Sequence, residues 1–248
     1  LLAHSGRGSE AEELLRRAVT LNPEMAAVHS ELGRLYLGQG RFEDAFVRFR
    51  LALILTPDVA ETIADLSESL EGLGRLEEAA NGYRRAIQLE SNDPTHYYRL
   101  GKVLMKTGKP GDAAACFQQS VNMKPDHVAA NCELGIAYQK QNMLDYAVHY
   151  YQQAIALNPD YLEAKYRLAT AWLQLGHLDA AWPDFETRIK VKRLADFRLP
   201  QWDGSPLQGR RILLYTEGGL RDTVQFIRYA QFIKGQGGQV IVACQSEF

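Results

Sequence analysis

Cysteine and histidine are the residue types best suited to metal binding and disulfide formation, and their spacing in this chain indicates neither. The cysteines Cys116, Cys132 and Cys244 lie far apart and form no CxxC pair. The six histidines are also scattered, without HExxH or a comparable ligand spacing. We therefore expect free thiols in a reducing compartment, no metal site and no cofactor bound by this chain.

The overall charge and hydropathy narrow the classes of partner. The formal net charge is −2, whereas a general nucleic-acid binder presents a basic surface to the phosphates. No apolar run approaches the roughly 20 residues that a membrane-spanning helix needs. The sequence thus predicts no nucleic-acid partner and no membrane span.

The charged and aromatic residues that remain are positioned by a repeat of 34 residues that runs through most of the chain. Several residue types recur in one common register, which predicts a stacked array that buries its core between neighbouring repeats. The alanine column is Ala11, Ala45, Ala79, Ala113, Ala147 and Ala181. The glycine column is Gly6, Gly40, Gly74, Gly108 and Gly176, with Asn142 in the remaining slot.

Each repeat is expected to be a pair of helices, as the second unit illustrates. The spacing of its apolar residues predicts a first helix that ends at Gly40, where a left-handed conformation is easily adopted. A second helix then carries Ala45 and Phe49 on one face and stops before Pro57. Gly33 and Ala45 allow the two helices to approach closely, and the ring of Phe49 fills the space beside them.

These columns resemble the tetratricopeptide repeat (TPR) family. The resemblance implies a mainly α fold, a right-handed superhelix of helical hairpins over residues 1–195. It divides this region into a half repeat over 1–25 and full repeats over 26–59, 60–93, 94–127, 128–161 and 162–195. The last unit departs from the pattern at Arg188 and Arg193, which suits a terminal repeat with a solvent-facing side.

The same resemblance implies that the first helix of each pair lines a concave groove. Its early positions are mostly acidic: Glu31, Arg34, Glu61, Asp65, Glu68 and Glu71. Its late positions are mostly basic, Glu133 excepted: Tyr98, Arg99, Lys102, Lys106, Lys140, Tyr166 and Arg167. Such a polarised groove would attract a ligand of both charge signs, or an acidic segment in its basic half. Two plainer interpretations stay open, namely ordinary solvated helix surfaces and tyrosines that pack between repeats.

Two sub-families of the repeat are a poor match to the groove. Repeats that clamp the C-terminal carboxylate of chaperones use Asn with Lys or Arg at defined positions, and the matching slots here hold no such set. Arrays like that of O-GlcNAc transferase carry a ladder of Asn, where this chain has Glu31, Asp65, Arg99, Glu133 and Arg167.

The carboxyl-terminal region changes class after residue 195. Residues 196–210, with two prolines and a DG turn signal, are expected to form a linker. Arg211–Tyr215 and Gln239–Ala243 are short apolar runs typical of buried parallel strands, and Val224–Lys234 has helical spacing. This order predicts the start of a Rossmann-like βαβ domain over residues 211–248, truncated after one unit.

This region resembles bacterial proteins in which TPRs precede a heptosyltransferase-like glycosyltransferase domain. The resemblance rests on Trp202-Asp203-Gly204, on the first strand and on Glu217–Phe226, where Gly218 and Arg221 depart from the family's usual Glu-Gln-Gly-Leu-Gly-Asp. It implies that Asp222 is the catalytic base toward an acceptor hydroxyl and that the parent protein uses a nucleotide-sugar donor. The alternative is that Asp222 caps the helix that begins near Thr223.

These observations favour a scaffold that binds a protein or peptide in its groove. The alternative function is the acceptor-selecting arm of a glycosyltransferase, inactive in this chain because the sugar-nucleotide lobe would come second. The tail is also interpretable as a cap that shields the last repeat. The missing initiator Met suggests a piece of a longer, cytoplasmic bacterial protein, and self-association stays open.

Overall fold

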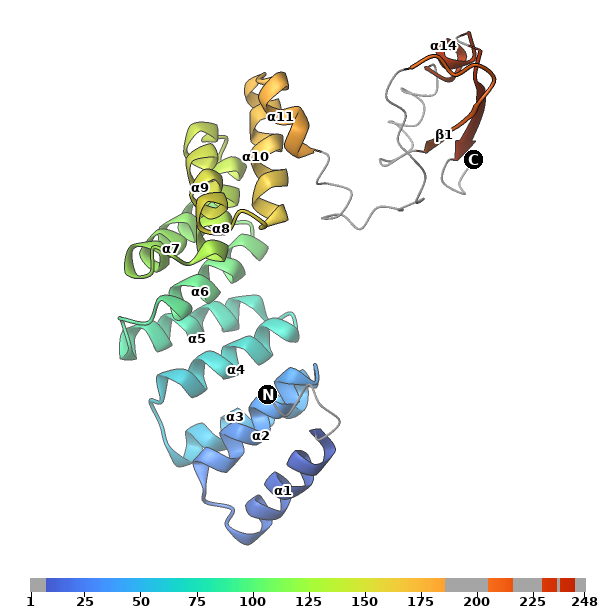
Figure 1. The fold of residues 1–248 in the computed structure, drawn as a ribbon. Helices are drawn as coiled ribbons and strands as arrows, with labels where there is room; N and C mark the ends of the chain where they lie inside the picture. The colour runs from blue at the N-terminus through green and yellow to red at the C-terminus, as the bar shows by residue number, and fades with distance from the viewer. Residues whose placement is uncertain (1–7, 186–204, 216–228, 236, 244–248) are drawn as a thin grey trace. The chain divides into compact units, whose positions relative to one another are not determined.

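The computed structural model describes residues 8–185, 205–215, 229–235 and 237–243. The chain divides into two compact units, Leu1–Thr187 and Arg188–Phe248, which we call unit 1 and unit 2. Unit 1 is a row of helix-turn-helix hairpins, and unit 2 combines a short helix with a small sheet (Figure 1). The described part of the chain is therefore mainly helical, as the sequence predicts.

In unit 1 a single helix is followed by five pairs that share one register. The helices are α1 (Gly8–Leu21), α2 (Ala26–Gly38), α3 (Phe42–Leu55), α4 (Ala60–Gly72), α5 (Leu76–Leu89), α6 (Pro94–Lys106), α7 (Pro110–Met123), α8 (Val128–Lys140), α9 (Leu144–Leu157), α10 (Leu162–Leu175) and α11 (Leu178–Phe185). Among these helices none is long and apolar enough to cross a membrane.

The turn inside each hairpin depends on one residue with a left-handed backbone. The φ angles are 71° at Gly40, 75° at Gly74, 74° at Gly108 and 84° at Gly176. Glycine adopts this conformation without the clash that a Cβ atom causes. The fourth full turn uses Asn142, with φ of 60°, because asparagine tolerates the left-handed region better than most residues. The glycine column of the sequence is thus a column of helix ends.

The core of the hairpins is formed by the alanine column and by an aromatic column, whose rings stand four residues after the alanines. Ala45, Ala79, Ala113, Ala147 and Ala181 are fully buried, as are the rings of Phe49, Tyr83, Phe117 and Tyr151, whereas Ala11 in the single helix α1 is half-buried. A Cβ atom at Gly101 would lie only 2.6 Å from Cε1 of Phe117, and one at Gly135 would lie 2.6 Å from Cε1 of Tyr151. The close approach predicted from the small residues is confirmed.

The hairpin of α4 and α5 reaches the same close packing with the small residue on its other helix. Ser67 stands where other hairpins carry Gly33, Gly101 and Gly135, and its Oγ donates a hydrogen bond to the carbonyl oxygen of Ile63 at 2.7 Å. The facing residue on α5 is Gly82, where the neighbouring hairpins carry Arg48 and Cys116. A Cβ atom at Gly82 would lie 2.0 Å from Ser67 Oγ, so any other residue at this position would displace the hydroxyl from its hydrogen bond to Ile63.

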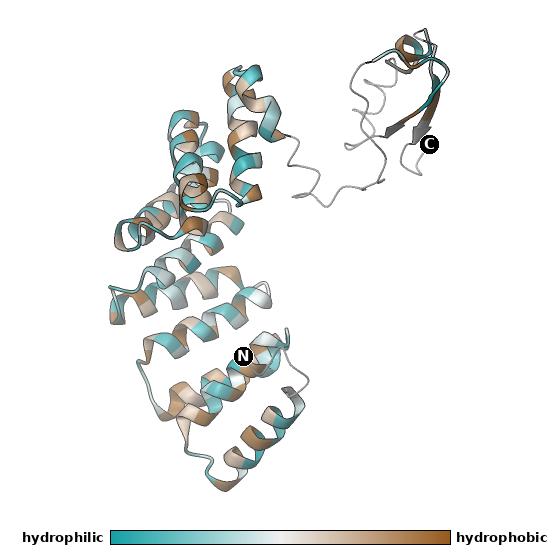
Figure 2. Cartoon of the chain, in the orientation of Figure 1, coloured by the Kyte–Doolittle hydropathy of each residue, from teal (hydrophilic) through white to brown (hydrophobic). Residues whose placement is uncertain are grey.

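The buried residues are distributed along unit 1 and do not gather at one centre. In Figure 2 every hairpin carries hydrophobic and hydrophilic stretches side by side. Apolar clusters join each hairpin to its neighbours, one of them running from Ala60 to Ala137. The first helices α2, α4, α6, α8 and α10 approach one another more closely than the second helices do. Their shared side, which we call the inner face, is the side on which the groove was predicted.

Unit 2 contains β1 (Arg211–Tyr215), α14 (Tyr229–Gly235) and β2 (Gln239–Ala243). The two strands are parallel, with Arg211 opposite Gln239 and Tyr215 opposite Ala243. Their bounds agree with the sequence prediction. Two short strands do not make a Rossmann-like fold, however, and the described residues of unit 2 do not support that expectation.

Several sequence predictions for the C-terminal region fall outside the residues that the structure describes. They concern Arg188, Arg193, Trp202, the loop that ends at Asp222, and Cys244. The helix expected over Val224–Lys234 is described only from Tyr229 onward.

Candidate functional site

Arg34 of α2 begins a series of ion pairs along the inner face. Its guanidinium contacts Glu31 on its own helix at 2.7 Å. It also contacts Glu61 at 2.9 Å and Asp65 at 2.8 Å, both on α4. One predicted groove residue thus joins the first helices of two successive hairpins.

Asp65 continues the series to the next hairpin. Its side chain is only 10% exposed and also meets the guanidinium of Arg99 on α6, at 3.6 Å. Arg99 contacts Glu68 at 3.3 Å in addition. We call Arg34, Asp65 and Arg99 the ion-pair ladder. Because acidic positions of α4 bind basic positions of α2 and α6, most charges of this stretch are paired, and the groove is less polarised than the sequence suggests.

The remaining predicted residues lie farther along the inner face. Arg167 of α10 contacts Glu163 of the same helix at 2.7 Å, and its guanidinium lies 5.9 Å from the ring centroid of Tyr166, which is buried. Lys140 is exposed at the end of α8. Burial raises the pKa of Glu133, although Lys102 and Arg167 act in the opposite direction. These residues do not gather in one place.

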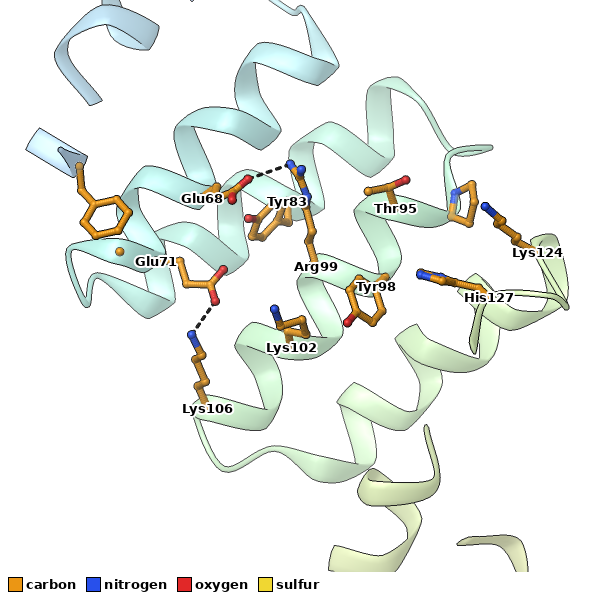
Figure 3. Close-up of a pocket in the computed structure, with 13 residues that line it drawn as sticks. Glu68, Glu71, Tyr83, Thr95, Tyr98, Arg99, Lys102, Lys106, Lys124 and His127 are labelled. Carbon is orange, nitrogen blue, oxygen red and sulfur yellow. Dashed lines mark hydrogen bonds and ion pairs between the residues drawn. The ribbon is translucent and has the colours of Figure 1, made fainter. Parts of the chain in front are cut away.

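A pocket of about 540 Å³ opens where α4 and α6 meet the neighbouring helices (Figure 3). Six predicted groove residues line it: Glu68, Glu71, Tyr98, Arg99, Lys102 and Lys106. The other lining residues are Phe42, Gly72, Tyr83, Pro94, Thr95, Lys124 and His127. The pocket therefore draws on first helices, second helices and the turn before α8.

The charges of the pocket do not balance. Arg99 is paired with Glu68, and Lys106 binds Glu71 at 2.6 Å. Lys102 and Lys124 make no ion pair with any residue that the structure describes. They leave an excess of positive charge beside an opening that a ligand can enter.

Aromatic rings form one wall of the pocket. The ring of Tyr98 lies 5.9 Å from Phe117 and 4.9 Å from the imidazole of His127, between centroids. Lys102 Nζ lies 5.8 Å from the centroid of Tyr98. Burial raises the pKa of Tyr98 to about 12. Burial and the nearby Lys124 lower the pKa of His127, so its imidazole is neutral near pH 7. The wall thus adds apolar surface and little charge.

Tyr83 lines the pocket with a hydroxyl group that has no hydrogen-bond partner among the described residues, although the side chain is fully buried. Burial raises its pKa far above the ordinary value, so the hydroxyl stays protonated and remains a donor. Tyr83, Lys124 and His127 were missed by the sequence analysis because they do not lie on first helices. The available signal was that Tyr83 interrupts an aromatic column that holds phenylalanine at Phe49 and Phe117.

The described residues include no candidate metal site and no reactive thiol. No group of three or more His, Cys, Asp or Glu side chains there is placed to hold a metal ion. Cys116 and Cys132 are free thiols, and burial raises the pKa of the first to about 11 and of the second to about 12. Both therefore carry very little reactive thiolate near neutral pH.

Comparison with protein families identifies the repeats. Models of the tetratricopeptide repeat match residues 2–66, 98–142 and 128–161, and a model described as TPR repeat matches 73–108. None of the four describes a glycosyltransferase, and no curated protein matches the chain.

Solved structures match at low sequence identity. YrrB, described as a TPR protein with an unusual peptide-binding site, is 20% identical, with a TM-score of 0.62 over 73% of this chain and 94% of YrrB. MamA of Desulfovibrio magneticus RS-1 is 21% identical, with a TM-score of 0.63 over 69% and 97% of the two chains. PilF of Pseudomonas aeruginosa is 19% identical, with a TM-score of 0.67 over 77% and 86%. At such identities these matches speak for the fold alone, and together with the family models they show that the chain carries an array of tetratricopeptide repeats.

Proposed function

We propose that the array is a scaffold that binds an extended protein segment along its inner face, and that it prefers an acidic one. The observation that carries this proposal is the pocket between α4 and α6, where Lys102 and Lys124 find no acidic partner in the described part of the chain, beside the ring of Tyr98. An apolar wall with excess positive charge suits a segment that combines acidic and apolar side chains. The peptide-binding site named for YrrB, a protein of similar fold, agrees with a role of this kind.

Panning a phage-displayed library of random peptides on the full chain is expected to enrich sequences rich in Asp and Glu. Lys102→Glu should weaken binding of the selected peptides about tenfold or more, roughly 1.4 kcal/mol, because it replaces attraction by repulsion. Fluorescence anisotropy with labelled copies of those peptides measures the change.

The matched control for this experiment is Arg17→Glu. Arg17 is exposed on α1, outside the pocket, and undergoes the same change of charge. It should leave the affinity within about a factor of two, as expected for a distant, screened charge. Selected peptides without an acidic bias, or equal losses in the two variants, would contradict the proposal.

A second candidate function is the acceptor-selecting arm of a heptosyltransferase-like glycosyltransferase that uses a nucleotide sugar. It is supported by the sequence resemblance around Asp222 and by the two parallel strands at the expected residues. The role of Asp222 as base stays a proposal, because this residue lies outside the described part of the chain.

Asp222→Asn in the complete natural protein is expected to abolish sugar transfer from nucleotide-sugar donors, because an amide does not accept the proton of the acceptor hydroxyl. The melting temperature should stay the same, and Asp179→Asn on the exposed side of α11 is the control. Turnover that survives in Asp222→Asn would rule out the catalytic role.

A further inference from the structure

We infer that the Tyr83 hydroxyl and the Lys102 ammonium together form a receptor for one carboxylate group of the bound segment, an Asp or Glu side chain. This inference rests on the proposed binding function and specifies which group the pocket takes. A carboxylate has two oxygens, so it accepts one hydrogen bond from the hydroxyl and one from the ammonium.

The Tyr83 hydroxyl is not required for packing. The equivalent positions of the hairpins before and after it hold Phe49 and Phe117, which are buried to the same extent without a hydroxyl. Burying a hydroxyl without a partner is unfavourable, so an unpartnered one at a pocket wall points to a partner from outside.

Tyr151, the tyrosine two hairpins further on, shows what an internally satisfied hydroxyl looks like. Its hydroxyl donates to Oε1 of Gln139, twelve residues earlier, at 2.7 Å. The residue twelve positions before Tyr83 is Glu71. The carboxylate of Glu71 instead accepts a hydrogen bond from Nζ of Lys106 at 2.6 Å. The Glu71 carboxylate is thus held by Lys106, and the Tyr83 hydroxyl makes no hydrogen bond to it.

Lys102 is the second donor, and comparison with Arg34 explains why it lacks a partner. The two residues occupy the same position of their repeats, two periods apart. Arg34 contacts Glu31, Glu61 and Asp65. The residues at the matching positions around Lys102 are Arg99, Ala129 and Glu133. Only Glu133 is acidic, and it makes no ion pair with Lys102. A ligand carboxylate would therefore serve as the acidic partner that Arg34 has within the chain.

The acidic side chains of the pocket favour a carboxylate over a phosphate. Glu68 and Glu71 line the same space as Lys102 (Figure 3). A phosphate group has three acceptor oxygens, so the two donors would leave one oxygen unpaired beside these two carboxylates, whereas both oxygens of a ligand carboxylate are satisfied. Lys124, the other lysine without an acidic partner among the described residues, lies near His127 and adds a general attraction.

The test uses three fluorescein-labelled peptides of about ten residues, built from Ser, Ala and Leu with Glu, Gln or phosphoserine at the two central positions. Anisotropy titrations with the full chain should show the Glu peptide binding about tenfold more tightly than the Gln peptide. Tyr83→Phe and Lys102→Gln should each weaken the Glu peptide about tenfold, the loss expected for a hydrogen bond to a charged group, and leave the Gln peptide unchanged.

Tyr151→Phe is the matched control, because it removes a hydroxyl from the same position of another hairpin, where that hydroxyl is bonded within the chain. It should not alter peptide affinity, and Tyr83→Phe should fold because phenylalanine stands at the equivalent positions. Equal affinity of the wild type and Tyr83→Phe for the Glu peptide overturns the receptor, as does tighter binding of the phosphoserine peptide. A Glu peptide whose affinity responds to Lys140→Glu but not to Tyr83→Phe or Lys102→Gln overturns the receptor and keeps the groove function. Failure of all three peptides to bind overturns both.

Discussion

Replacing Phe117 by alanine is expected to lower the free energy of unfolding by about 3–5 kcal/mol, the usual effect of emptying a buried aromatic site. The ring is fully buried between α6 and α7, where it contacts the backbone of Gly101 and the ring of Tyr98. Urea titration followed by circular dichroism measures the loss. The control is Ile54→Ala, which truncates a side chain that is 69% exposed and should change stability by no more than about 0.5 kcal/mol.

The contact between Gly101 and Phe117 provides an independent check on the same packing. Gly101→Ala would place a Cβ atom 2.6, 2.8 and 2.9 Å from three ring atoms, so it should cost about 1–3 kcal/mol in spite of alanine's helix propensity. In the double variant with Phe117→Ala the new methyl group has room. The loss of unfolding free energy in the double variant should therefore be smaller than the sum of the losses in the two single variants. Strict additivity would mean that the two residues are not in contact.

Replacing Asp65 by alanine is the second large loss that we expect, about 1–3 kcal/mol. The Asp65 carboxylate is nearly buried, and it accepts a hydrogen bond from Nε of Arg34 at 2.8 Å and faces Arg99. Its removal leaves two guanidinium groups close together without their shared counter-charge. The loss is smaller than for a fully buried pair, because Arg34 and Arg99 are about one-third exposed. Each also retains an ion pair with another carboxylate, Arg34 with Glu61 and Arg99 with Glu68.

Glu61→Ala is the matched comparison for Asp65→Ala. Glu61 contacts the same guanidinium of Arg34, but its side chain is 69% exposed. Exposed pairs contribute about 0–1 kcal/mol, so this variant should be close to the wild type. Thermal unfolding of both variants in one buffer makes the comparison. If the two lose the same stability, burial of Asp65 in the ion-pair ladder is not the source of its effect.

The parts of the fold that were predictable depend on short-range rules. A left-handed backbone needs Gly40 or its equivalents, and a tight helix contact needs Gly33 or Gly101 opposite a ring. Both signals are visible in the sequence because they recur at a fixed period. The strands Arg211–Tyr215 and Gln239–Ala243 were also predictable, since each is a continuous apolar run. A Rossmann-like domain did not follow from them, because two strands do not define a sheet topology.

The candidate site was less predictable, because it depends on which ion pairs the charged side chains form in the folded array. Residue types alone assigned Asp65 to an acidic half and Arg99 to a basic half, whereas the stacking of hairpins brings these two together. The Tyr83 hydroxyl is a further case, because Glu71, the nearest counterpart of the acceptor of Tyr151, binds Lys106 and leaves this hydroxyl without a partner among the described residues. Repeat-by-repeat comparison of the sequence singles out Tyr83 between Phe49 and Phe117, without showing that Tyr83 and Lys102 line one pocket.

The exchange of small residues between α4 and α5 bears on how an array like this can be rearranged in evolution. The Ser67 hydroxyl on α4 leaves no room for a Cβ atom opposite it, and α5 supplies glycine there at position 82. Recombination that joined α4 to the second helix of a neighbouring repeat would bring Arg48 or Cys116 against Ser67. Duplications and exchanges that move a whole hairpin keep the matched pair together. The hairpin, and not the single helix, is therefore the unit that can be copied or transplanted at this point of the chain.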